Sequence, residues 1–268
     1  MLKTRVITAL VLASGLLVVL FLLPRVAAVA AFSAVVALAA WEWVGLLHAG
    51  FHGRWLFGLM TLLPCAALYL ADMPMPLLIM LWSLALIFWL LLVPLWLRQR
   101  WALHANTVGF LVGWLLLIPS WASMVLLHAN SPWLLLAAMA LVWVADIAAY
   151  FSGRAFGRHK LAPSISPGKT WEGAAGAVLA VLVYGFVVGR ISDKLPLMAT
   201  SQLLLAALGL LLLTVVSILG DLFESLAKRQ AGLKDSSSLL PGHGGVLDRI
   251  DSLTSALPLA GLTAAWVT

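Results

Sequence analysis

Residues 202–251 read QLLLAALGLLLLTVVSILGDLFESLAKRQAGLKDSSSLLPGHGGVLDRID and pass from an apolar run into a charged one. The apolar part, 202–223, is long enough to cross a bilayer as a helix, which takes about 20 residues. The charged part, 225–251, gathers lysine, arginine, aspartate and histidine before a second apolar run begins. This stretch therefore predicts a membrane-spanning fold with a candidate site at one end of its helices.

The composition of the whole chain supports this interpretation. Of 268 residues 63% are hydrophobic and only 10% are charged, whereas a soluble domain carries about 25% charged residues. Repeated long apolar runs favour an all-α helical bundle over a β-barrel, whose strands alternate polar and apolar residues. The single cysteine, Cys65, excludes a disulfide within the chain and a cysteine-based metal site. The net charge of +6 does not call for a nucleic-acid partner, because basic residues are expected on cytoplasmic loops.

Hydropathy predicts nine membrane spans. The first is expected to be a retained helix rather than a signal peptide, because no convincing small-residue cleavage site precedes Pro24. The third and ninth spans are the weakest, being short and interrupted by Pro64 and Pro258, and an eight-span arrangement is the alternative. The predicted spans lie at about 6–23, 26–47, 55–71, 76–97, 107–127, 132–152, 173–191, 202–223 and 250–267.

Basic residues orient these spans. With a cytoplasmic N-terminus, the outer segments hold only Arg25, Arg190 and Lys194. This asymmetry is what the positive-inside rule predicts, so the N-terminus is expected in the cytoplasm. The tryptophans are expected to act as anchors at the membrane interfaces. The basic residues of the inner segments are Lys3, Arg5, Arg54, Arg98, Arg100, Arg154, Arg158, Lys160, Lys169, Lys228, Arg229, Lys234 and Arg249.

The two halves of the chain differ in polar content. Residues 1–130 form about five scaffold spans, and 131–268 form the catalytic region with cytoplasmic loops 153–172 and 225–249. Glu42 is the exception in the first half, since an ionisable residue within a span is a functional candidate by default. Its tryptophan neighbours indicate a position near an interface, which favours a structural or helix-packing role over catalysis.

The first polar block of the second half is WVADIAAYFSGRAFGRHKLAPSISPGKTWEG, residues 143–173. Asp146 lies within a span, and Gly153 and Gly157 are expected to end the helix that carries it. The tripeptide G-K-T in 166–170 suggests a phosphate-binding P-loop, but the upstream glycine that this motif requires is absent and no strand is expected before it. What remains is a basic loop whose amides and hydroxyls suit phosphate oxygens. An ordinary basic loop is the alternative, but it does not explain Asp146.

The second polar block follows the eighth span. Asp221, Ser225 and Lys228 share a helical face there, and the glycines of 241–245 allow backbone amides to approach an anion closely. Carboxylates without cysteine indicate Mg²⁺ rather than Zn²⁺, and the lysines and arginines beside them indicate phosphate groups. Such a composition is typical of phosphoryl or nucleotidyl transfer, in which positioning and charge neutralisation do most of the catalysis.

These blocks resemble a known family. The pattern S-x-x-K-R-x4-K-D…P-x-H-G-G-x-x-D-R-x-D is similar to the signature of the phosphatidate cytidylyltransferases, also called CDP-diacylglycerol synthases. Chain length and span number agree over the whole chain, and the motifs are specific from Asp146 onward. Ala227 and Gly168 depart from residues common in that family, without removing a charged group. The residues that carry the pattern are Ser225, Lys228, Arg229, Lys234, Asp235, Pro241, His243, Gly244, Gly245, Asp248, Arg249 and Asp251.

The resemblance implies a Mg²⁺-dependent reaction of CTP with phosphatidic acid that gives CDP-diacylglycerol and pyrophosphate. Asp221 and Asp248 are expected to hold one metal ion or two, with Asp146, Asp235 and Asp251 as additional ligands. The catalytic residues implied are Asp221, Asp248, Lys228, Arg229 and His243. The residues expected to bind the phosphates of CTP and phosphatidic acid are Ser166, Lys169, Thr170, Ser225, Lys228, Arg229, Lys234, Gly244, Gly245 and Arg249.

Two other classes stay open at this point. A CTP- or ATP-dependent lipid or polyprenol kinase would share the membrane, the metal and the nucleotide, but would transfer the γ-phosphate. A transporter is less favoured, because its charges would lie near the midplane and in both halves. The expected location is a bacterial inner membrane with the site facing the cytoplasm and in contact with membrane lipids. If the protein forms an oligomer, a homodimer is expected.

Overall fold

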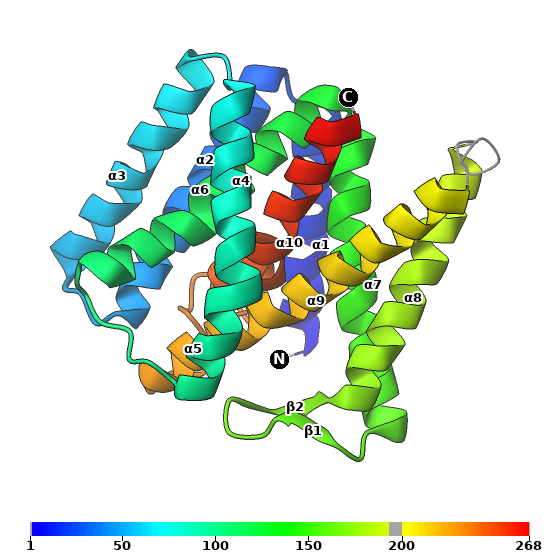
Figure 1. The fold of residues 1–268 in the computed structure, drawn as a ribbon. Coiled ribbons are helices and arrows are strands. Elements are labelled where there is room, and N and C mark those ends of the chain that lie inside the picture. Colours follow the sequence, from blue (N-terminus) through cyan, green and yellow to red (C-terminus); the bar gives the residue numbers. More distant parts are fainter. Residues whose placement is uncertain (1, 193–199, 268) are drawn as a thin grey trace.

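The computed structural model describes residues 2–192 and 200–267, which form a helical bundle (Figure 1). Lys194, one of the three basic residues assigned to the outer segments, lies outside these ranges. The described helices are α1 (Leu2–Phe21), α2 (Arg25–Leu46), α3 (Phe51–Leu70), α4 (Met75–Ile87), α5 (Val93–Gln99), α6 (Thr107–Asn130), α7 (Pro132–Phe156), α8 (Trp171–Ile191), α9 (Thr200–Gln230) and α10 (Leu247–Val267).

The nine predicted spans correspond to nine helical rods in the described ranges. A π-helical turn, η1 (Phe88–Leu92), joins α4 to α5 in one rod, and the other helices are one rod each. Eight of the nine rods are long and apolar enough to cross a membrane, which confirms a polytopic all-α membrane protein. The remaining rod is α10, which begins with Asp248, Arg249 and Asp251.

The rods alternate in direction, so the two chain termini lie at opposite ends of the bundle (Figure 1). The connections 47–50, 100–106, 157–170 and 231–246 lie toward the end where the chain begins. We call this the basic end, because most lysines and arginines of the chain belong to these connections or to the helix turns beside them. The polar blocks predicted from sequence therefore meet at one end of the bundle.

Helix α10 forms the centre of the bundle. It packs against α9, α6 and α4, and Ser252 to Leu259 are all buried. Large apolar side chains of α1, α3 and α8 point outward instead, for example Ile7, Leu63 and Leu179. The polar serines and threonine of α10 are tolerated because protein surrounds the helix, and outward apolar faces suit the lipid around the bundle.

Several tryptophans belong to the core, which contradicts the expectation that they anchor the interfaces. Trp43, Trp82, Trp89 and Trp121 are essentially inaccessible. Three of these indole N–H groups donate a hydrogen bond within the bundle, that of Trp43 to Gly109 O at 2.9 Å, that of Trp82 to Pro119 O at 3.0 Å and that of Trp121 to the Ser33 hydroxyl at 2.9 Å. The N–H of Trp89 is buried without a partner among the described residues. Polar groups inside the bundle thus let most of these bulky aromatic side chains fill the core with a partner for the indole N–H.

The polar connections differ locally from their predicted form. Residues expected as a loop form an antiparallel hairpin of β1 (Lys160–Ala162) and β2 (Ser166–Thr170), so SPGKT is a strand. Gly153 does not end a helix; it lies within α7 and faces Gly173 of α8, while Gly157 is the C-cap residue. Helix α9 continues to Gln230, so the connection to α10 is 231–246 rather than 225–249.

Candidate active site

Five carboxylates from three helices gather at the basic end. Asp146 from α7 interacts electrostatically with Asp221 of α9, and Asp251 of α10 interacts with both. Glu224 of α9 in turn interacts with Asp251 and Asp248. We call these five residues the carboxylate row. Neighbouring carboxylates repel one another when ionised, and two lysines lie among them.

Lys169 provides one of these cations. It extends from β2, and its Nζ lies 2.7 Å from Oδ2 of Asp221. The other oxygen of Asp221 accepts a hydrogen bond from Ser225, one helical turn further, at 3.1 Å. The hairpin is held at this place because Thr170 caps α8, its hydroxyl accepting the Gly173 N–H at 3.1 Å. The strand that was expected to be a phosphate loop thus carries its lysine to the carboxylate row.

Lys228 provides the second cation. Its Nζ lies 2.5 Å from Oε2 of Glu224 and 2.6 Å from Oδ1 of Asp248. Glu224 and Asp248 are almost fully buried, with side chains 2% and 3% exposed. Burying one charge without a partner is costly, so this triad is a single electrostatic unit. Sequence reasoning gave Lys228 and Asp248 roles in the site and gave Glu224 none; its position one turn before Lys228 was the available signal.

Asp248 also organises the start of α10. Its second oxygen, Oδ2, accepts hydrogen bonds from Gly245 N at 2.8 Å and from the Ser236 N–H and hydroxyl at 2.8 and 2.9 Å. A carboxylate that reaches back three residues to a backbone N–H resembles half of a capping box. The Gly245 amide, which was expected to bind a phosphate of the substrates, is thus directed at a protein carboxylate.

The glycines of this turn are required by close contact. Gly242 and Gly244 have φ angles of +77° and +82°, which favour glycine. A Cβ added to Gly244 would lie 2.6 Å from Oδ2 of Asp248, and one added to Gly245 would lie 2.1 Å from the Ser236 hydroxyl. The turn therefore folds tightly around the Asp248 carboxylate.

Glu42 reaches the same turn from the N-terminal half. It is completely buried, so it does not reach water or lipid headgroups as a position near an interface would allow. Its Oε1 accepts hydrogen bonds from the Ser237 hydroxyl at 2.6 Å and Val246 N at 2.9 Å. Its Oε2 accepts from Leu247 N at 2.6 Å and from the Ser236 hydroxyl at 3.1 Å. A structural role was favoured from sequence, and these contacts agree with it.

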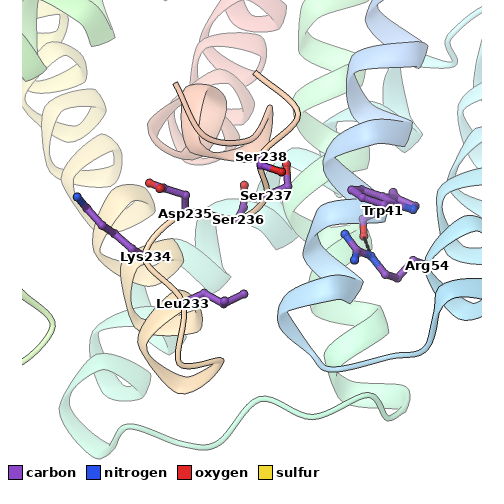
Figure 2. A pocket seen from close by; sticks show the side chains of 8 residues that line it. All are labelled: Trp41, Arg54, Leu233, Lys234, Asp235, Ser236, Ser237 and Ser238. Atoms are coloured by element: carbon purple, nitrogen blue, oxygen red, sulfur yellow. Dashed lines mark hydrogen bonds between the residues drawn. The ribbon is translucent and has the colours of Figure 1, made fainter. Parts of the chain in front are cut away.

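An open hollow of about 470 Å³ lies beside Glu42 and the turn that it binds. Figure 2 shows Trp41 and Arg54 on one side of it and Leu233 to Ser238 of the α9–α10 connection on the other. The Arg54 guanidinium lies 3.5 Å from the centre of the Trp41 ring, a cation–π contact. Lys234 and Asp235, both expected near the phosphates or the metal, line this hollow and are exposed.

The remaining predicted residues have more varied surroundings. Arg229 is exposed and contacts backbone carbonyls, Leu233 O at 3.4 Å and Ile165 O at 3.5 Å. Arg249 is exposed on the first turn of α10. His243 is half-buried, and its Nδ1 is buried without a hydrogen-bond partner among the described residues. Ser166 begins β2 opposite Ala162.

The donor chemistry of the carboxylate row suits Mg²⁺. All its ligating atoms are carboxylate oxygens, which this hard cation prefers. Within residues 2–192 and 200–267, however, no three acidic, histidine or cysteine side chains already converge on one point. Asp221 and Asp248 are each paired with a lysine instead. A metal ion there would compete with Lys169 and Lys228 for the same oxygens.

The fold and this site define a class: a polytopic membrane protein whose buried carboxylates and lysines lie together at one end of its helices. Comparison with known proteins gives the family. Residues 3–266 match the model of the cytidylyltransferase family, and the chain belongs to that family.

Curated relatives agree. A phosphatidate cytidylyltransferase of Pseudomonas aeruginosa is 46% identical over 272 residues, which cover 97% of this chain and 95% of that protein. One of Haemophilus influenzae is 52% identical over 130 residues, 47% of this chain and 43% of that protein. One of Brucella suis is 45% identical over 151 residues, 53% of this chain and 52% of that protein.

Proposed function

We infer that this protein transfers CMP from CTP to phosphatidic acid and releases pyrophosphate, forming CDP-diacylglycerol. The observation that carries this function is the end-to-end similarity to a phosphatidate cytidylyltransferase at 46% identity. The carboxylate row with its two lysines supports it, because both substrates are anions that must be brought together.

In the reaction, an oxygen of the phosphatidate phosphate attacks the α-phosphorus of CTP. A new P–O bond forms there, and the bond between the α-phosphorus and the bridging oxygen to the β-phosphate breaks. The attacking oxygen already carries negative charge, so no strong general base is needed. Neutralising and aligning two anions is the main catalytic task.

Lys169 is the residue proposed to meet the phosphates first. Its pair with Asp221 leaves 23% of the lysine and 30% of the aspartate side chain exposed, whereas the Lys228 triad is closed. Arg229 and Arg249, exposed at the same end of the bundle, are proposed to bind phosphate oxygens as well.

Mg²⁺ is part of the proposal. Asp221 and Asp248 would hold it, with Asp146 and Asp251 beside them. The ion would supply positive charge to the triphosphate. Chelation should abolish turnover and added Mg²⁺ should restore it. Binding of Mn²⁺, followed by its electron paramagnetic resonance, should weaken in Asp221→Asn; unchanged Mn²⁺ binding in both Asp221→Asn and Asp248→Asn would contradict this assignment.

The site is proposed to face the cytoplasm of a bacterial inner membrane. The gathering of lysines and arginines at the basic end supports this orientation. A cysteine introduced at the exposed Ser238 should react with a membrane-impermeant maleimide in inverted vesicles and not in intact spheroplasts. Reaction from the outer side would reverse the orientation.

The deciding experiment uses CTP labelled at either the α- or the γ-phosphate. Purified protein with phosphatidic acid and Mg²⁺ should place the α-label in the lipid and release the γ-label as pyrophosphate. Lipid carrying the γ-label would instead identify a kinase, and label in neither product would favour a transporter.

A further inference from the structure

We propose that Glu42 is a positioning residue for the transfer reaction: from α2, it fixes the turn that carries Asp248. This inference rests on the proposed function. It concerns a residue nearly two hundred positions away in sequence from the polar block that it would control.

Both carboxylate oxygens of Glu42 accept two hydrogen bonds each. Each carboxylate oxygen accepts one backbone N–H and one serine hydroxyl, so all four bonds lead to residues 236–247. The two N–H groups, of Val246 and Leu247, lie where α10 begins. A helix N-terminus favours negative charge, and hydrogen bonds to an ionised acceptor are roughly twice as strong as neutral ones. Glu42 therefore holds the first residues of α10 from outside that helix.

One side chain links Glu42 directly to the carboxylate row. The Ser236 hydroxyl lies 3.1 Å from Oε2 of Glu42 and 2.9 Å from Oδ2 of Asp248. A hydroxyl has one proton, so it can donate to only one of the two carboxylates at a time. Its backbone N–H donates to Asp248 as well. Movement of Glu42 would thus shift Ser236 and, through it, the Asp248–Lys228 pair.

The Glu42 carboxylate packs so closely against Gly245 that no side chain fits there. A Cβ on Gly245 would lie 2.5 and 2.6 Å from the two oxygens of Glu42. The Glu42 carboxylate therefore lies against the backbone of the turn. A misplacement of about 1 Å at a reacting group can cost roughly 10²-fold in rate, so a clamp this close controls activity as well as folding.

Two substitutions separate positioning by hydrogen bonds from simple space filling. Glu42→Gln keeps the shape, but its NH₂ group would face one of the two backbone N–H groups, so it can accept only one of them. Glu42→Asp keeps two accepting oxygens on a side chain shorter by one methylene. Positioning predicts that kcat decreases in the order Glu, Asp, Gln. A role in packing alone predicts that Gln is tolerated better than Asp.

The experiment measures turnover of α-labelled CTP, well below each variant's melting temperature. Glu42→Gln should lower kcat by roughly 10²-fold, while KM for CTP and phosphatidic acid changes little. Thr61→Val is the matched control, because Thr61 is also buried and hydrogen-bonded but lies in α3 against Trp114. It should keep its kcat even where its loss of thermal stability equals that of Glu42→Gln.

A second readout does not depend on activity. Hydrogen exchange of the Val246 and Leu247 amides, which donate to Glu42, should be roughly tenfold faster in Glu42→Gln, about 1.4 kcal/mol of easier opening, and unchanged in Thr61→Val. Retained kcat in Glu42→Gln, an equal loss in Thr61→Val, or unchanged exchange of these amides would each overturn the positioning role. If the wild-type protein forms no α-labelled lipid, the proposed function fails, and the exchange rates alone decide whether Glu42 clamps the turn.

Discussion

The two lysine–carboxylate centres of this protein use the same chemistry in different surroundings. Lys169 reaches Asp221 from a short hairpin and leaves both groups partly exposed, whereas Lys228 is closed between Glu224 and Asp248 in the interior. An exposed ion pair contributes little to stability, while a buried one cannot lose a partner cheaply. The difference teaches that the first centre is open to the phosphates of the substrates, whereas the second, whose Asp248 is proposed to bind Mg²⁺, also stabilises the fold around the site.

The largest effect is expected from Lys228→Met. This change leaves Glu224 and Asp248 buried without their cation, which should destabilise the protein by roughly 3–5 kcal/mol and abolish turnover. Thermal unfolding in detergent micelles measures it. Lys234→Met, an exposed lysine on the next connection, is the control and should melt like the wild type. Wild-type stability in Lys228→Met would break the comparison.

The next largest effect is expected from Lys169→Met, and it should lower activity rather than stability. Here kcat should fall by roughly 10²–10³-fold, as when one transition-state donor is removed, while stability changes by less than about 1 kcal/mol. Lys160→Met, on the other strand of the same hairpin, should keep most activity. If Lys169→Met destabilises the protein as much as Lys228→Met, Lys169 also has a structural role and the contrast between the two centres is wrong.

A smaller effect should come from Gly245→Ala, which tests how tightly the turn packs around Asp248, at the buried Lys228 centre. The added methyl group meets the Ser236 hydroxyl and the Glu42 carboxylate, and such overpacking costs roughly 1–3 kcal/mol. Gly168→Ala, on the hairpin of the open centre, has no other atom within 4 Å of the new Cβ and should change stability by no more than about 0.5 kcal/mol. Equal melting temperatures for both variants would argue against a tightly packed turn.

The smallest effect is expected from Ser225→Ala, which removes one hydrogen bond to Asp221. Stability should fall by about 0.5–1.5 kcal/mol, and kcat should fall only a few-fold, because Lys169 still holds Asp221. A loss of kcat as large as that of Lys169→Met would mean that Ser225, and not Lys169, determines the position of Asp221.

Much of the fold could be predicted from sequence, because hydropathy and basic residues depend on local composition. All nine predicted spans are helical rods. The hairpin of β1 and β2 was missed, since its few residues carry no alternating apolar pattern and tertiary contact with α9 stabilises it. Trp43 was assigned to an interface because sequence cannot tell which side of an apolar helix faces protein.

The candidate site was predicted by residue type but not by pairing. Asp248 and Lys228 were assigned separately to metal and phosphate, whereas the structure places them in direct contact. The Glu42 contacts were not predictable, because they join residues about 200 positions apart and depend on the packing of α2 beside α10. A buried glutamate in an apolar run was the only local signal of a connection.

The central position of α10 has a consequence for biosynthesis. Helix α10 follows α4, α6 and α9 in the chain, so these three helices leave the ribosome before the helix around which they pack. Helix α10 brings Asp248 with it. Until it inserts, the earlier helices lack their shared partner and Lys228 lacks one of its two carboxylates. A nascent chain that has not yet inserted α10 therefore lacks Asp248 and cannot complete the Lys228 triad.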